Sequence, residues 1–89
     1  MPQAIVDPEH LRQFAGALRA FTDELQQRSS SLGSQMIQLS QTWRDQQHHK
    51  FAAEFEDQLR QLARFLEGAR SHVPYLLRKA DEIDAYLRG

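Results

Sequence analysis

The 89-residue chain contains no cysteine, which excludes disulfide bonds and thiolate metal sites. It has only three prolines and four glycines, as expected of a chain that is mostly helical. Its 11 Lys and Arg residues nearly balance 12 Asp and Glu residues, so it has no basic field that would attract nucleic acid or anionic lipid. No stretch approaches the roughly 18 apolar residues of a membrane span. We therefore expect one small domain that neither binds nucleic acid nor crosses a membrane.

The N-terminus lacks both the basic start and the apolar run of a secretory signal peptide. We expect the protein to be cytoplasmic when made, and any export to use a route without a signal peptide. The sequence shows no Ser-His-Asp arrangement and no glycine-rich phosphate loop, so neither an enzyme nor a cofactor site is expected. The adjacent His48 and His49 would point about 100° apart on a helix. We interpret the histidines as solvated surface residues and predict no metal site.

A first helix is predicted over residues 8–41. Asp7 is a suitable N-cap, and Pro8 suits the first helical position. The serine-rich run 28–34 would locally destabilise this helix, but the seven-residue register continues through it unshifted. The repeat, which is typical of coiled-coil packing, consists of Leu11, Leu18, Leu25, Leu32 and Leu39, with Phe14 and Phe21 at the alternate position.

A second helix is predicted over residues 46–88, after a turn at 42–45 that contains the only tryptophan, Trp43. Pro74 lies inside this helix and predicts a kink there. Three helices, broken at the serine run and at Pro74, are the alternative, but their unequal lengths suit a compact bundle poorly. Two seven-residue series pattern this arm: Leu59, Leu66, Val73, Ala80 and Leu87, and Phe55, Leu62, Ala69, Leu76 and Ile83.

The predicted fold class is all-α, a long antiparallel helical hairpin that forms a single domain. Two helices make only one layer, which cannot cover the wide apolar stripe of the second arm. We therefore expect two hairpins to dimerise into a four-helix bundle, with a second copy or a related hairpin as the partner. The residues expected at the packing and dimer interface are Leu11, Phe14, Leu18, Phe21, Leu25, Phe55, Leu59, Leu62 and Leu66.

Two patterned arms that flank a central tryptophan turn resemble the WXG superfamily of early-secreted-antigen-like proteins, and the similarity covers essentially the whole chain. Trp43 matches the tryptophan of the family's Trp-x-Gly motif, and Phe51 matches the aromatic residue that begins the core of its second helix. Asp45 stands where the family has glycine. Aspartate is a leading N-cap, so we expect Asp45 to start the second helix by accepting a backbone hydrogen bond near Gln47 or His48.

The resemblance implies a substrate of type VII-like secretion, or the helical partner that escorts one, with a secretion ATPase or a secreted effector as further partners. The family's tail signal, a tyrosine followed four positions later by an acid, is absent, since Lys79 follows Tyr75 at that distance. Two other functions stay open at this point. One is a needle-type secretion subunit that polymerises, and the other is a cytosolic helical adaptor unrelated to secretion.

Overall fold

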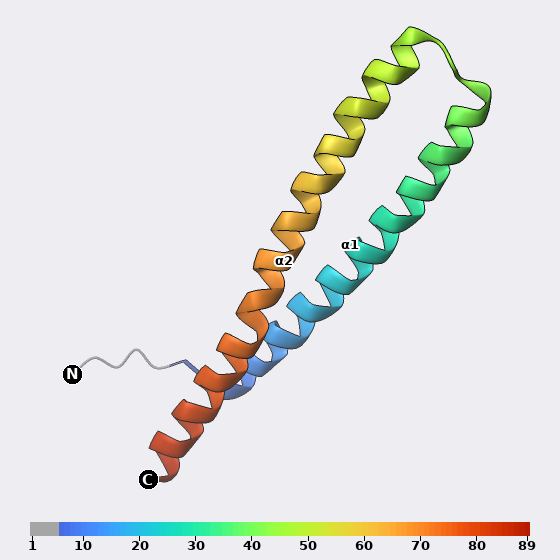
Figure 1. The fold of residues 1–89 in the computed structure, drawn as a ribbon. Coiled ribbons are helices and arrows are strands. Elements are labelled where there is room, and N and C mark those ends of the chain that lie inside the picture. Colours follow the sequence, from blue (N-terminus) through green and yellow to red (C-terminus); the bar gives the residue numbers. More distant parts are fainter. Residues whose placement is uncertain (1–5) are drawn as a thin grey trace.

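The structure, a computed structural model, describes residues 6–89 and consists there of two antiparallel helices joined by a short turn (Figure 1). Helix α1 spans Pro8–Thr42 and helix α2 spans Gln46–Arg88. The predicted all-α hairpin is therefore confirmed. The expected absence of a signal peptide concerns a segment that includes residues 1–5, which lie outside the described residues.

Both helices begin at an aspartate whose side chain caps the first turn. Asp7 accepts a hydrogen bond from the backbone nitrogen of Glu9 at 2.9 Å, and Pro8 occupies the first turn of α1. Asp45 caps α2 in the same way. Neither the serine run in α1 nor Pro74 in α2 ends its helix, so the three-helix alternative is wrong.

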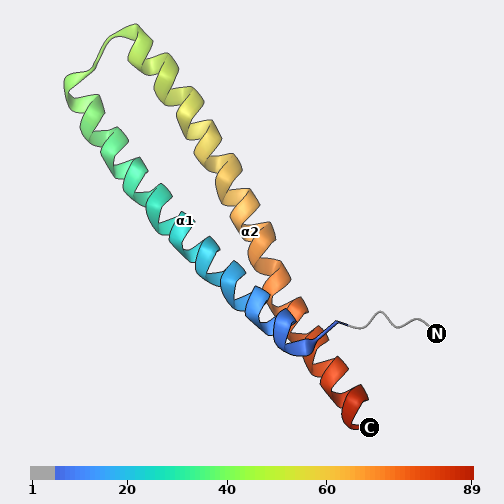
Figure 2. The same cartoon turned by 180° about the vertical axis from the view of Figure 1, so that it is seen from behind.

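The hairpin is a thin, elongated layer, with principal extents of 67 × 21 × 13 Å (Figure 2). Its radius of gyration is 20.1 Å, whereas a compact domain of this length has about 12 Å. It exposes 7033 Å² of surface, against about 5400 Å² expected for a compact protein of 10.4 kDa. The single chain therefore leaves far more surface in solvent than a self-sufficient globular domain does.

The seam between the helices buries mainly small side chains. Ala15 and Thr22 of α1 and Ala80 of α2 are almost completely buried, and Leu66 is the largest apolar residue in the core. Small residues let the two helix backbones approach each other closely, but they remove little apolar surface from water. The hairpin thus has a narrow core that extends along its length.

The apolar repeat of α1 rotates out of this seam toward the turn. Leu11, Leu18 and Leu25 are half-buried against α2, but Leu32 and Leu39 are 47% and 41% exposed. The half-buried positions near the turn include Gly33, Met36 and Ser40 instead. A straight α-helix drifts by about 20° for every seven residues relative to a strict heptad. The later leucines therefore lie on an outer face of the hairpin.

Candidate partner-binding face and hairpin tip

One broad side of the hairpin carries large apolar side chains that α1 and α2 leave uncovered. We call it the aromatic face, and it consists of Phe14, Phe21, Leu32, Leu39, Phe51, Phe65 and Tyr75. All seven side chains are between two-fifths and three-fifths exposed. Exposed apolar groups gathered on one side of a small protein mark an interaction site.

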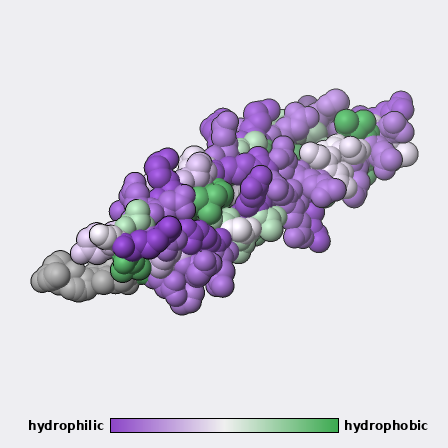
Figure 3. All heavy atoms as spheres, turned by 90° about the horizontal axis from the view of Figure 1, so that it is seen from below, coloured by the Kyte–Doolittle hydropathy of each residue, from purple (hydrophilic) through white to green (hydrophobic). Residues whose placement is uncertain are grey.

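Two grooves follow the aromatic face, one near the open end of the hairpin and one near the turn. The open-end groove has a volume of about 750 Å³, and its lining includes Phe14, Leu18, Phe65 and Tyr75. The groove near the turn has about 330 Å³ and is lined by Leu32, Gln35, Met36, Leu39, Phe51 and Phe55. Figure 3 shows one side of the molecule, on which apolar residues surface in separate patches among hydrophilic ones. The separate linings of the two grooves divide the apolar surface of the aromatic face along the hairpin.

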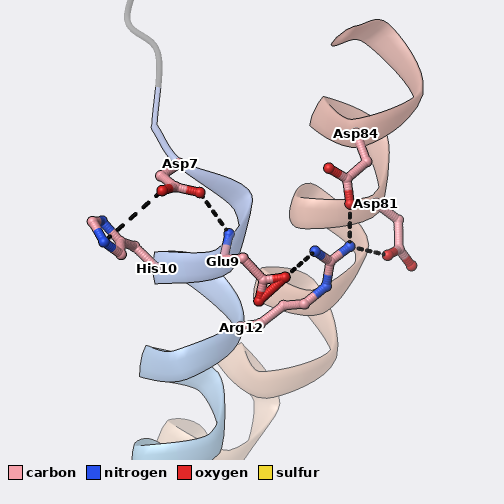
Figure 4. Close-up of polar contacts among 6 residues, drawn as sticks. All are labelled: Asp7, Glu9, His10, Arg12, Asp81 and Asp84. Atoms are coloured by element: carbon pink, nitrogen blue, oxygen red, sulfur yellow. Dashed lines mark hydrogen bonds and ion pairs between the residues drawn. The ribbon is translucent and has the colours of Figure 1, made fainter. Parts of the chain in front are cut away.

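The opposite side, which we call the bonded face, is held together by polar contacts between the helices. Arg12 of α1 reaches the carboxylates of Asp81 and Asp84 in α2, with Nη2 at 2.8 and 2.6 Å from their oxygens (Figure 4). These two hydrogen bonds, that of Asp81 first, raise the pKa of Arg12 above its ordinary value. The charged guanidinium links the open ends of the two helices.

Arg70 makes a second link on the bonded face. Its Nη2 donates to the backbone oxygen of Thr22 at 3.3 Å and approaches a carboxylate oxygen of Asp23 at 3.4 Å. It also donates to the side-chain oxygen of Gln26. Because these partners lie on α1 and Arg70 on α2, the contacts set the register of the antiparallel pair. The bonded face thus joins the two helices through Arg12 and Arg70, whereas the aromatic face leaves large apolar side chains in solvent.

Trp43 connects the turn to the aromatic face. Its backbone N–H donates to the carbonyl of Leu39 at 2.9 Å and closes the last turn of α1. Its half-buried ring lies 5.9 Å from the ring of Phe51, which stacks at 5.7 Å on Phe55. The three rings form a continuous aromatic row that leads from the turn into the groove lined by Phe51 and Phe55. Trp43 therefore both packs the turn and borders the candidate binding surface.

His48 is buried, and the interpretation of the histidines as solvated surface residues is wrong for this one. Only 6% of His48 is exposed, and its ring meets that of Trp43 edge-on at 5.1 Å. The hydroxyl of Ser40 donates to the carbonyl of Met36 at 2.9 Å, so it accepts from the ring Nε2 of His48 at 3.0 Å. Sequence reasoning missed this because Ser40 contributes its hydroxyl from the other helix.

Asp45 starts α2 from an extended backbone conformation, with φ of −87° and ψ of −177°. Its carboxylate accepts a hydrogen bond from the backbone nitrogen of His48 at 2.9 Å, and this bond is the main cause that lowers its pKa below the ordinary value. No residue in 6–89 adopts a positive φ. The turn therefore does not need the conformational freedom of the glycine that Asp45 replaces.

Replacing Asp45 by alanine is expected to lower the melting temperature, since the first turn of α2 loses its cap. Asp45→Asn keeps a capping oxygen. The melting temperature of Asp45→Gly is expected to lie between those of Asp45→Ala and Asp45→Asn. The folded-state pKa of Asp45 is depressed, so its stabilisation is fully present above the unfolded value of 3.8 and is lost as the pH falls through the folded value. Thermal melts from pH 2 to 7 should show this acid loss in the wild type and less of it in Asp45→Asn. An identical acid profile for both chains would contradict this assignment.

The nine residues predicted at the interface fall into two groups. Phe14 and Phe21 point away from the seam onto the aromatic face. The other seven lie along the seam, where Leu66 is buried and the rest are half-buried: Leu11, Leu18, Leu25, Phe55, Leu59, Leu62 and Leu66. Phe14, Phe21 and Arg28 follow one another at seven-residue steps, so they lie along one line of α1. This line faces solvent, since all three residues are exposed.

The described residues offer little support for other kinds of site. Within 6–89, no three His, Asp or Glu side chains come together as possible metal ligands. Neither of the two helices in that range combines the length and the apolar character that crossing a bilayer requires. The aromatic face and the tip formed by Trp43 and its neighbours are the surfaces with distinctive chemistry.

Comparison with known proteins agrees with this architecture. The family model described as "Proteins of 100 residues with WXG" matches residues 3–85, which is nearly the whole chain. No curated protein and no solved structure gives a significant match. The matched range contains both helices almost entirely and the turn with Trp43. The chain belongs to the WXG100 family.

Proposed function

We propose that this protein acts in a type VII-like secretion pathway, as a small secreted substrate or as the helical partner that escorts one. Membership of the WXG100 family over residues 3–85 is the observation that carries this proposal. It favours a secretion role over the needle-type subunit and the unrelated cytosolic adaptor. The protein would work by binding other proteins, with no reaction of its own.

The aromatic face supports a pairing function, because it is a large apolar surface that the two helices leave uncovered. A second WXG-like hairpin laid on this face would complete a four-helix bundle. It would also remove from water the side chains that line the two grooves. The bonded face would remain in solvent, where Arg12 and Arg70 already join the two helices.

The hairpin ends are the surfaces that such a bundle would display to a secretion ATPase or an effector. Trp43 lies at one end, and the last turn of α2 at the other exposes Tyr86 and Leu87. Since Lys79 stands where the usual tail signal has an acid, a partner chain would supply that signal. Export would then depend on pairing.

Replacing Trp43 by alanine tests whether the tip serves packing or recognition. Because the ring is half-buried, we expect the free energy of unfolding to fall by about 1–3 kcal/mol, less than for a fully buried Trp. Trp43→Phe should retain much of this stability because it keeps a ring beside Phe51 and His48. Urea denaturation followed by circular dichroism measures the loss. Unchanged stability combined with lost ATPase binding would assign Trp43 to recognition alone.

The secretion role is tested in native cells. Affinity purification of the chain, with mass spectrometry of culture supernatant and lysate, identifies its partner and its location together. We expect a hairpin partner and a supernatant signal that disappears when the pathway's ATPase is deleted. A chain found only in the cytosol, bound to a protein that is never exported, would overturn the proposal in favour of the adaptor.

A further inference from the structure

We infer that a groove on the bonded face binds an extended acidic segment of another protein. A carboxylate of that segment pairs with Arg19, and an apolar side chain of it packs against Pro74 and Leu77. The groove belongs to a single hairpin, so this binding does not require the pairing proposed above. It gives the protein a second interaction surface, on the side opposite to the aromatic face.

The groove lies between α1 and α2, beside the link that Arg70 makes. It has a volume of about 450 Å³ and is lined by Arg19, Asp23, Arg70, Val73, Pro74 and Leu77. Pockets that hold ligands have volumes of about 300–1000 Å³. The apolar part of the lining comes from α2 alone, where Val73 is buried but Leu77 remains 38% exposed. The groove therefore leaves apolar surface in water next to charged groups.

The charges around the groove favour an acid. The Asp23 carboxylate is already approached by Arg70 at 3.4 Å, whereas Arg19 is exposed and forms no ion pair with any of residues 6–89. Arg78 lies four residues beyond Pro74 on the same side of α2, and it too is exposed and without an ion pair in that range. A guanidinium can hold both oxygens of a carboxylate. An incoming acid would thus find positive charge that no residue of the described hairpin neutralises.

Pro74 adds a backbone acceptor to the same groove. Proline has no N–H, so the carbonyl of Arg70, four residues earlier, lacks its usual helical donor. Arg70 and Pro74 both line the groove, and α2 continues through Pro74 without ending. A backbone N–H is a natural donor for such a carbonyl. An extended segment can offer its N–H groups there, whereas those inside a helix are already bonded within the helix.

These features together describe a polypeptide rather than a polyanion. An extended acidic segment carries a carboxylate, an apolar side chain and free N–H groups within a few residues, and alternate side chains of it point to the same side. Nucleic acid has no apolar side chain for Pro74 and Leu77. It would also be repelled by Asp23 in the lining and by a chain whose net charge is −1.

Selection from a display library of random short peptides tests the groove on the full chain. We expect the enriched peptides to combine Asp or Glu with an apolar residue, and one of them, made synthetically with a fluorescent label, serves as the probe. Arg19→Gln should raise the dissociation constant of this peptide at least about 10-fold, as for the loss of a charged hydrogen bond. Fluorescence anisotropy measures it.

Arg64→Gln is the matched control. Arg64 is also exposed and forms no ion pair with any residue of the described range, but it lines the open-end groove on the aromatic face. We expect Arg64→Gln to leave peptide binding unchanged. Loss of binding in Arg64→Gln but not in Arg19→Gln would place the peptide on the aromatic face and overturn the inference.

Pro74→Ala separates the backbone acceptor from the stability of the helix. Alanine restores the N–H and with it the helical bond to the carbonyl of Arg70, so the melting temperature should rise. The dissociation constant of the peptide should nevertheless rise about 3- to 10-fold, because the peptide loses one hydrogen bond. Weaker binding by a more stable chain cannot come from loss of the fold.

Enriched peptides without an acid, or peptide binding that Arg19→Gln and Pro74→Ala both leave unchanged, overturn the inference. The proposed function fails separately. A chain that stays in the cytosol without a hairpin partner, but still binds the peptide through Arg19, would overturn the secretion role and leave the groove assigned.

Discussion

Replacing Phe65 by glutamate is expected to raise the dissociation constant of the proposed pair of hairpins at least about 100-fold and to leave each hairpin helical. Phe65 is 56% exposed and lines the open-end groove. Burying a phenylalanine side chain contributes about 1.5–3 kcal/mol, and a pair of identical hairpins would lose this contribution twice. The new carboxylate would also be covered without a partner, which adds a desolvation penalty. Sedimentation equilibrium and helical circular dichroism measure association and fold separately.

Ile37→Glu is the matched control for this substitution. Ile37 is 67% exposed, so it is at least as accessible as Phe65, but it borders a groove with Gly33 and Glu56 on the other side of the hairpin. We expect Ile37→Glu to leave association unchanged. The reverse result, dissociation by Ile37→Glu and none by Phe65→Glu, would show that the opposite face binds the partner.

Replacing Leu66 by alanine is expected to lower the free energy of unfolding by about 2–5 kcal/mol, as in other buried leucines. Leu66 directly follows Phe65 but points into the seam, where only 3% of it is exposed. The other fully buried residues of the seam are mainly small, so they cannot fill the cavity that the substitution leaves. Because folding and association are linked, urea denaturation must be compared at one fixed protein concentration.

Leu66→Met is the control for cavity formation, since it keeps the volume and should cost less than about 1.5 kcal/mol. The adjacent pair Phe65 and Leu66 then separates two roles within one helical turn. Phe65→Glu should mainly weaken association, whereas Leu66→Ala should mainly lower the stability of the hairpin itself. Equal unfolding free energies for Leu66→Ala and the wild type would mean that the seam is not the source of stability.

Much of the fold was predictable because its signals are local. Asp7 and Pro8 at the start of α1 need only their immediate neighbours to act, and Asp45 caps α2 through a residue three positions away. The seven-residue repeats indicated long helices, and the central Trp43 divided them into two arms. The same features supported the family resemblance, which the match over residues 3–85 confirms.

The direction of individual side chains was less predictable. Leu32 belongs to the same repeat as Leu25, yet it is exposed because a straight helix drifts away from a strict heptad. His48 resembled a solvated surface residue, but it is buried between Ser40 and Trp43. Spacing along the chain does not show how the second helix is rotated about its axis or at what height it lies. Both depend on contacts between residues far apart in sequence.

The sequence by itself determined two capped helices, the position of the turn and membership of the WXG100 family, since these follow from periodicity, local hydrogen bonding and motif. Only the tertiary structure decided which apolar side chains close the hairpin and which remain for a partner. The small residues Ala15 and Ala80 are buried in the seam, while Phe14 and Phe65 are left outside. The physical reason is the width of the seam, because two closely packed helices can cover only a narrow stripe of each other's surface.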